Sequence, residues 1–295
     1  MNSFFSDIER LASAMPREED GDYIDSEGFL VCGSCGTRKQ RKVMLMGVNR
    51  IVTCMCRCES ERYDREEEER IARERIARIR AARAEGIQDT KMLDCTFEQD
   101  DGQNKTISDL AHKYVDHWEE MYDANQGLVL TGDVGCGKTF IAGCIANALI
   151  DHGVPVLATD FTKIISALEN EKDRGEYIRS LDRYGLLIVD DLGAERQSEW
   201  ALEQVYAVVN GRYKAKKPAI FTTNISAEEL KSPKDVRYSR IYDRIMEMCI
   251  PIVVKGKSRR KNIAEEKKAA ARKILFGGGN DAEIHHTPCA GEQEE

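Results

Sequence analysis

The chain has 295 residues, of which 41% are hydrophobic and 33% are charged, and its formal net charge is −8. This composition predicts a globular core with long exposed helices or tails, and the acidic total does not indicate a general nucleic-acid-binding protein. No apolar run approaches the roughly 18 residues of a membrane span, and the N-terminus lacks a secretory signal, so we expect a cytoplasmic protein with mostly reduced cysteines.

The N-terminal part of the chain divides into a polar segment and a Cys-rich module. Residues 1–28 are expected to be irregular, with one short helix near residues 6–15. Residues 29–60 hold Cys32 and Cys35, two residues apart like a zinc knuckle, and then Cys54, Cys56 and Cys58. A tetrahedral Zn²⁺ site needs four thiolates, so one of the last three is a spare. Without zinc such a short module has too little core to fold, and the alternative is free thiols in a disordered arm.

Residues 61–89 are predicted to form one charged linker helix. Glutamate and arginine recur four residues apart, which stabilises a helix, in the pairs Glu66/Arg70, Glu69/Arg73 and Glu74/Arg78. The apolar stripe is narrow and consists of Ile71, Ile76 and Ile79. Two interpretations remain open, a solvated spacer helix or a docking helix for a partner protein.

Residues 90–260 alternate short apolar runs with amphipathic stretches. Strands are predicted at 128–131, 154–159, 186–190, 220–223 and 250–254, and continuous apolar runs are typical of parallel strands buried on both faces. Helix ends are marked by Gly153, by a cap at Ser198 and by the capping box of Ser226 and Glu229. The alternation predicts an α/β fold with a doubly wound parallel sheet. Residues 261–295 are expected to form a charged tail, helical at its start and largely disordered.

A phosphate-binding loop lies between the first of these strands and a helix. The pattern G-x4-G-K-T places backbone N–H groups, a helix N-terminus and a lysine around nucleotide phosphates, and its Thr hydroxyl can bind Mg²⁺. ATP is therefore the expected ligand. The predicted cofactor-binding residues are Gly132, Asp133, Val134, Gly135, Cys136, Gly137, Lys138, Thr139 and Phe140. Cys136 inside the loop is a candidate for oxidation.

Polar residues follow two later strands of the predicted sheet, 186–190 and 220–223. Leu186–Asp191 is an apolar run that ends in two acids, and a phosphate-loop ATPase needs a carboxylate there for its Mg²⁺. Asp190 with Thr139 fits the metal role, and Asp191 fits a base that orients the attacking water. Asn224 ends the following strand and is a candidate for positioning that water, or a simple turn residue.

Together these motifs resemble the DnaC/IstB branch of the AAA+ ATPases, especially the DnaC-type replicative helicase loaders. The resemblance covers about residues 90–260. Its pieces are TFEQ at 96–99, the phosphate loop with its flanks at 127–150, LLIVDDLGAER at 186–196, FTTNIS at 221–226, and RIYDRI with KGKSRR within 240–260. The Asp-Asp-Leu-Gly form is more specific to the family than the loop. Asp191 stands where AAA+ enzymes usually have Glu, so slow hydrolysis is expected.

The resemblance implies further catalytic roles. Asn224 would be the sensor-1 residue. Arg240 would be the finger that reaches a neighbouring subunit's γ-phosphate, with Arg244 as its competitor, and Arg260 would be the sensor-2 residue, with Arg259 as the alternative. The AAA+ lid is expected to be missing, as in the family.

The resemblance also implies the zinc ligands and the partners. Related loaders end their zinc arm with a Cys-x-Cys pair, so the Zn²⁺ ligands would be Cys32, Cys35, Cys56 and Cys58, with Cys54 as the spare. A helicase loader would bind a DnaB-type replicative helicase and single-stranded DNA, and it would self-associate as a hexamer or open ring, with hydrolysis controlling release. The alternatives are an IstB-like transposition helper ATPase on duplex DNA, and a binding module that keeps its ATP.

Overall fold

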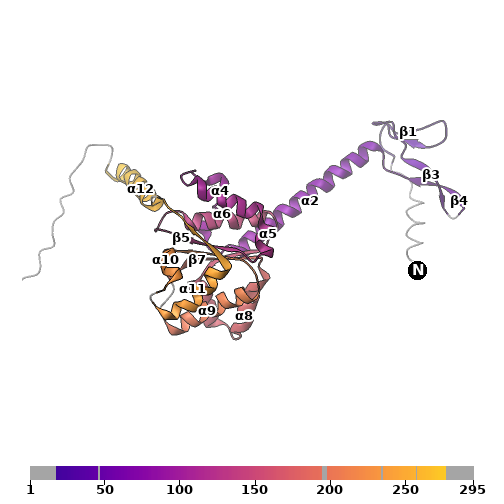
Figure 1. Ribbon diagram of the computed structural model, residues 1–295. Coiled ribbons are helices and arrows are strands. Elements are labelled where there is room, and N and C mark those ends of the chain that lie inside the picture. The colour runs from indigo at the N-terminus through magenta and orange to yellow at the C-terminus, as the bar shows by residue number, and fades with distance from the viewer. Residues whose placement is uncertain (1–17, 46, 195–197, 234, 257, 277–295) are drawn as a thin grey trace, which may run out of the picture. The chain divides into compact units, whose positions relative to one another are not determined.

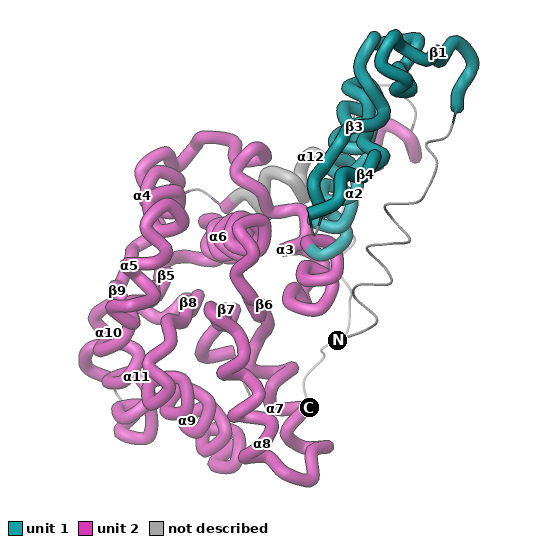
Figure 2. Tube along the Cα trace, turned by 90° about the vertical axis from the view of Figure 1, so that its right-hand side faces the viewer, with its two compact units in different colours: residues 1–78 teal, residues 79–295 magenta. Residues whose placement is uncertain are grey.

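The structure is a computed structural model that describes residues 18–45, 47–194, 198–233, 235–256 and 258–276 (Figure 1). The chain divides into two compact units, residues 1–78 and 79–295, which Figure 2 separates by colour. In the described part of the chain, no helix combines the length and the apolar character that crossing a membrane requires. The short helix predicted near residues 6–15 lies outside the described residues.

The first unit is built from two small antiparallel sheets. Strand β1 (Tyr23–Ile24) pairs with β2 (Leu30–Val31), and β3 (Gln40–Leu45) pairs with β4 (Val48–Thr53). The Cys-rich module therefore begins earlier than residue 29. Lys39 is 3% exposed, and its ammonium lies 2.6 Å from the Asp22 carboxylate. The sequence could not reveal this burial, because two charged residues that pair in the interior cannot be told in a sequence from two charges at the surface.

Helix α2 (Arg57–Gly86) follows the second hairpin. Arg70 pairs with Glu67 and with Glu74, each at 2.6 Å, so the predicted pair with Glu66 is replaced by one at i−3. Ile71 and Ile76 are half exposed, whereas Ile79 packs on the core of the second unit. The C-terminal turns thus belong to the second unit, and a partner for the exposed stripe stays a prediction.

The second unit contains a five-stranded parallel sheet. Its order is β6-β7-β8-β5-β9, which confirms the predicted doubly wound fold. The strands are β5 (Gly127–Thr131), β6 (Val156–Asp160), β7 (Leu186–Leu192), β8 (Ala219–Thr223) and β9 (Cys249–Val253). Strand β5 lies between β8 and β9, so the loop that follows it emerges beside the ends of its neighbours.

Alternate residues of the sheet feed two separate hydrophobic cores. Val129, Val189 and Phe221 face a core formed with α7 (Phe161–Asn170), α9 (Glu199–Lys214) and α11 (Val236–Met248). Leu130, Ile188 and Ile220 face a core formed with α4 (Lys105–Asp116) and α6 (Lys138–Asp151). Figure 1 shows α4 and α6 on one side of the sheet and α9 and α11 on the other. Both faces are covered, which explains why the strands are continuously apolar.

Short helices complete the second unit. They are α3 (Thr90–Leu93), η1 (Phe97–Gln99), α5 (Trp118–Asp123), α8 (Arg174–Ser180), η2 (Leu181–Arg183) and α10 (Ala227–Lys231). Helix α12 (Arg259–Phe276) covers the start of the tail, where a helix was expected; residues 277–295 lie outside the described part.

The predicted helix ends are confirmed. The Ser198 hydroxyl accepts from the Ala201 N–H at 3.1 Å, and the Ser226 hydroxyl accepts from the Glu229 N–H at 3.1 Å. Gly153 follows α6 with φ of +83°, the left-handed conformation that favours glycine, and donates to Ile150. These local signals could be predicted because each involves residues within one turn of the helix end.

Candidate functional site

The phosphate loop connects the central strand β5 to α6 and needs its glycines. Gly132, Gly135 and Gly137 have φ of +148°, +85° and +104°. A Cβ at Gly132 would lie 2.3 Å from the Val254 carbonyl oxygen, so no larger residue fits there. The chain can therefore turn tightly and begin α6 at Lys138 with its free N–H groups at the loop.

Lys138 lies buried at the centre of the loop. Its ammonium donates to the carbonyl oxygens of Gly132 at 2.8 Å and Asp133 at 2.9 Å, and to the Asn224 side-chain oxygen at 2.8 Å. This last hydrogen bond joins two predicted site residues, Lys138 at the start of α6 and Asn224 just after β8. A lysine held in this way can neutralise the β/γ-phosphate charge of a nucleotide.

Asp190 is fixed by two hydroxyls from different elements. It is 8% exposed, and the Thr139 hydroxyl donates to its carboxylate oxygens at 2.9 and 3.1 Å. The Thr222 hydroxyl donates to the same carboxylate from β8. A carboxylate and a threonine hydroxyl are hard oxygen donors of the kind that Mg²⁺ prefers. The donor set therefore fits Mg²⁺ at Thr139 and Asp190.

Burial raises the pKa of the Asp190 carboxyl above its ordinary value, and the neighbouring charge of Asp191 acts in the same direction. Hydrogen bonds from Thr222 and Thr139 lower the pKa and oppose part of this effect. A bound cation would favour the charged form further, because an opposite charge stabilises a carboxylate.

Asp191 is exposed and lies in a pocket with the loop. The pocket is lined by Val134, Gly135, Gly137, Lys138, Thr139, Phe140, Asp191, Asn224, Lys91 and Cys95. Eight of the predicted residues thus line one pocket, while the Asp190 carboxylate accepts a hydrogen bond from the Thr139 hydroxyl. Asp191 has φ of +53°, which is uncommon outside glycine.

Sequence reasoning missed Lys91 and Cys95, which line the pocket from the segment before TFEQ. Asn147 of α6 holds this segment through its side-chain nitrogen, which donates to the carbonyl oxygens of Met92 at 2.8 Å and Cys95 at 2.9 Å. An asparagine in the middle of an otherwise apolar helix was the only signal in the sequence.

The two candidate finger arginines of α11 differ in their surroundings. Arg244 lies over the rings of Tyr206 and Tyr213, 5.6 and 4.9 Å from their centroids. Arg240 is exposed and lines a separate pocket with Lys231 and Asp243. It does not line the nucleotide pocket of its own chain. Arg260 lies at the start of α12, and its side chain is outside what the structure describes.

Four cysteines of the first unit come together. The Sγ atoms of Cys32, Cys35, Cys56 and Cys58 all lie within 4.8 Å of one another. A regular zinc tetrahedron with Zn–S bonds of about 2.3 Å separates its sulfurs by about 3.8 Å, so the cluster fits one Zn²⁺. Cys54 faces away and donates to the Arg38 carbonyl oxygen at 3.4 Å. The predicted set of four thus coincides with the cluster.

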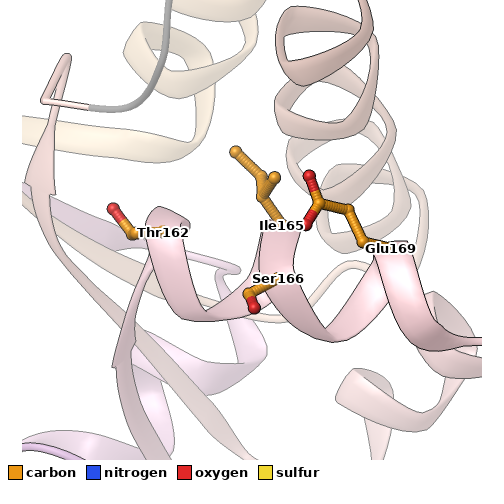
Figure 3. A pocket seen from close by; sticks show the side chains of 4 residues that line it. All are labelled: Thr162, Ile165, Ser166 and Glu169. Carbon is orange, nitrogen blue, oxygen red and sulfur yellow. The ribbon is translucent and has the colours of Figure 1, made fainter.

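Another pocket lies along α7 (Figure 3) and is lined by Thr162, Ile165, Ser166 and Glu169. Ile165 and Glu169 are one turn apart and point toward the same space. Its described lining offers one carboxylate, one apolar side chain and two hydroxyls, and neither hydroxyl is hydrogen-bonded to the carboxylate. This pocket offers no nucleophile with an adjacent base among them, so the loop pocket remains the candidate centre.

The chain is similar in sequence to several known proteins. A family model described as IstB-like ATP binding protein matches residues 57–268. The replicative helicase loader DnaI of Bacillus subtilis is 26% identical over 57% of this chain and 59% of its own length. The replicative helicase loader DnaC of Escherichia coli strain K12 is 28% identical over 46% of this chain and 58% of its own. The chain therefore spans about three fifths of these relatives.

One solved structure supports the same assignment of fold. It is a Streptococcus pyogenes serotype M3 protein, described provisionally as a primosome component. It aligns with a TM-score of 0.50 and 26% identity, covering 61% of this chain and 98% of its own.

Proposed function

The chain belongs to the family of IstB-like ATP-binding proteins, and from this premise we propose that it is a Mg²⁺-dependent ATPase that loads a replicative helicase. One observation carries the enzymatic part of the proposal: Lys138, Asp191 and Asn224 come from three different segments and line one pocket beside the loop. This arrangement supports nucleotide hydrolysis rather than binding alone.

Each residue of the pocket has a distinct task in the proposal. Lys138 and the loop N–H groups bind the phosphates, and Asn224, which already contacts the lysine, orients the attacking water. Asp191 accepts or directs the proton of that water from the exposed side of the strand end. Thr139 and Asp190 would hold Mg²⁺, which when bound neutralises charge on the phosphates.

Arg240 completes the site of a neighbouring subunit in this proposal. It is exposed on α11, whereas Arg244 is occupied by two tyrosines of its own chain. A guanidinium supplied in trans stabilises transition-state charge and couples hydrolysis to assembly. We therefore favour Arg240 over Arg244, and an ATP-dependent ring or spiral over a monomer. Arg260 keeps its proposed sensor-2 role.

We assign the binding of the replicative helicase to the Cys-rich module. Two of the named relatives are replicative helicase loaders, and the four-cysteine cluster gives the first unit a means of folding by zinc binding. In the proposed loader function, the assembled chains also bind single-stranded DNA, and the loader is released after ATP hydrolysis. The Arg and Lys residues of 255–261 are the candidates for contacting that DNA.

A transposition helper that acts on duplex DNA is the second candidate, because the matching family carries the IstB description. The two functions differ in their protein partner, a replicative helicase or a transposase. A chain that binds ATP without turnover is the third candidate, because Asp191 is one methylene shorter than the usual glutamate.

Capture of the cognate replicative helicase by the full chain, with turnover measured in parallel, tests the proposal. We expect the wild-type chain to retain the helicase and to hydrolyse ATP. Lys138→Ala should lose turnover, because the β/γ-phosphate charge is no longer neutralised. Retained turnover in Lys138→Ala would refute the site assignment, and absence of helicase capture would refute the loader function.

A further inference from the structure

Thr222 is a buried side chain beside the two acids that the proposed catalytic roles do not include. It belongs to β8, next to the acid-bearing strand β7, and its side chain is completely buried. Its hydroxyl oxygen accepts a hydrogen bond from the Asp191 backbone N–H at 2.9 Å. The same hydroxyl donates to the Asp190 carboxylate. One side chain therefore contacts both acids.

The strand pair needs this hydroxyl because the regular ladder is interrupted there. Val189 is opposite Phe221 and Leu192 is opposite Thr223, so β7 has one residue more than β8 over this stretch. Asp190 and Asp191 occupy the irregularity, and Asp191 has φ of +53°. A bulge leaves backbone groups without their ladder partners. Thr222 supplies a side-chain acceptor for the Asp191 N–H in place of a backbone carbonyl.

From this geometry we propose that Thr222 is a positioning residue that fixes the Asp190 carboxylate for Mg²⁺ and the Asp191 backbone for catalysis. The inference rests on the proposed ATPase function. Thr139 holds Asp190 from α6 and Thr222 holds it from β8, so the carboxylate is restrained on two sides. Since a hydroxyl can donate one hydrogen bond while accepting another, threonine or serine is required and valine cannot substitute.

Nucleotide binding without turnover gives the first test. ADP is titrated into the full chain by calorimetry, with Mg²⁺ and with EDTA, so the metal-dependent part of the affinity is measured directly. Wild type should bind ADP more tightly with Mg²⁺. Loss of a residue that orients a metal ligand weakens metal affinity by about 10- to 100-fold. Thr222→Val should therefore lose most of the Mg²⁺ effect and keep its affinity in EDTA.

Two smaller variants isolate the hydroxyl. Thr222→Ser and Thr222→Ala both remove the methyl group, and they differ only in the hydroxyl. Thr222→Ser should retain the Mg²⁺-dependent affinity and kcat, while Thr222→Ala should lose both with little change in KM. This comparison also decides the matter if Thr222→Val fails to fold. Equal behaviour of the serine and alanine variants would overturn the proposal.

Thr131→Val is the matched control. Thr131 is another buried threonine at the end of a neighbouring strand, and its hydroxyl has only a 3.5 Å contact to the Ile252 carbonyl oxygen. It should keep the Mg²⁺ effect of wild type. A loss in this control equal to that in Thr222→Val would also overturn the proposal. If wild type itself bound no nucleotide, the proposed function would fail, which is a different result from a Thr222 variant that behaves like wild type.

Discussion

Asn147 connects the helix behind the phosphate loop to the wall of the nucleotide pocket. Its amide nitrogen lies 2.8, 2.9 and 3.0 Å from the carbonyl oxygens of Met92, Cys95 and Gly143. The side chain is 2% exposed, and its oxygen has no hydrogen-bond partner in the described structure. The opposite amide orientation would set that oxygen against three carbonyls, so the nitrogen must face them.

We predict that Asn147→Ala destabilises the second unit. Each buried carbonyl left without its donor costs about 1–3 kcal/mol. Chemical denaturation followed by circular dichroism measures this change. Because Cys95 and Lys91 line the pocket, nucleotide affinity should fall as well.

Asn170→Ala is the matched control for that experiment. Its side-chain nitrogen also donates to a carbonyl, that of Ser166 at 2.8 Å, but it lies exposed in a single helix. Water can replace this bond, so stability and affinity should stay close to wild type. Equal destabilisation by the two variants would argue against the role assigned to Asn147.

At the scale of elements, the Cys-rich module gains order from contacts that join distant segments. Lys39, which directly precedes β3, forms ion pairs with Asp22 and Glu19. Cys56 and Cys58, the second pair of clustered cysteines, lie after β4. The hydrogen bond from Lys39 lowers the pKa of Asp22 to about 2. This pair therefore stabilises the module above the ordinary carboxyl pKa, and that contribution is lost as pH falls toward 2.

The cysteines can be distinguished by zinc content. Cys58→Ser removes one of four clustered thiols, whereas Cys54→Ser removes a thiol that faces the Arg38 carbonyl. Elemental analysis of the purified full chain should find about one zinc in wild type and in Cys54→Ser, and far less in Cys58→Ser. The ligand set would be wrong if Cys54→Ser lost the metal while Cys58→Ser kept it.

At the scale of the whole molecule, the proposed catalytic residues lie on two surfaces of the second unit. The loop pocket and the exposed Arg240 lie in different pockets of one chain. In the proposed assembly each chain therefore supplies a pocket to one neighbour and an arginine to the other.

Mixing two inactive variants tests this division. Arg240→Ala should bind nucleotide but lose turnover by on the order of 1,000-fold, as expected for a finger arginine. Lys138→Ala should be inactive for lack of a competent pocket. Mixed subunits pair an intact pocket with an intact arginine, so measurable turnover should return. A mixture as inactive as its components would contradict the shared site.

Arg244→Ala serves as the comparison variant. Arg244 lies half-buried over Tyr206 and Tyr213, and a cation–π contact contributes from about 0.5 kcal/mol when exposed to about 2 kcal/mol when desolvated. This variant should melt at a lower temperature and retain turnover. If Arg244→Ala abolished turnover while Arg240→Ala did not, the two assignments would have to be exchanged.

The amino-acid sequence by itself determined the features that depend on neighbours along the chain. The five strands of the parallel sheet, the helix caps at Ser198 and Ser226, and the loop from Gly132 to Thr139 all follow from local spacing and residue type. The phosphate loop could be predicted for the same reason, because one turn and one helix N-terminus supply most of its groups.

Only the tertiary structure decided which distant side chains meet. In the structure Asn224 accepts a hydrogen bond from Lys138, and the Thr222 hydroxyl contacts both Asp190 and Asp191. Lys91 and Cys95 line the nucleotide pocket, and Cys54 lies outside the four-cysteine cluster. These contacts depend on strand order and on an irregular register, which no local pattern encodes. The burial of Lys39 and the occupation of Arg244 by tyrosines depend likewise on long-range packing.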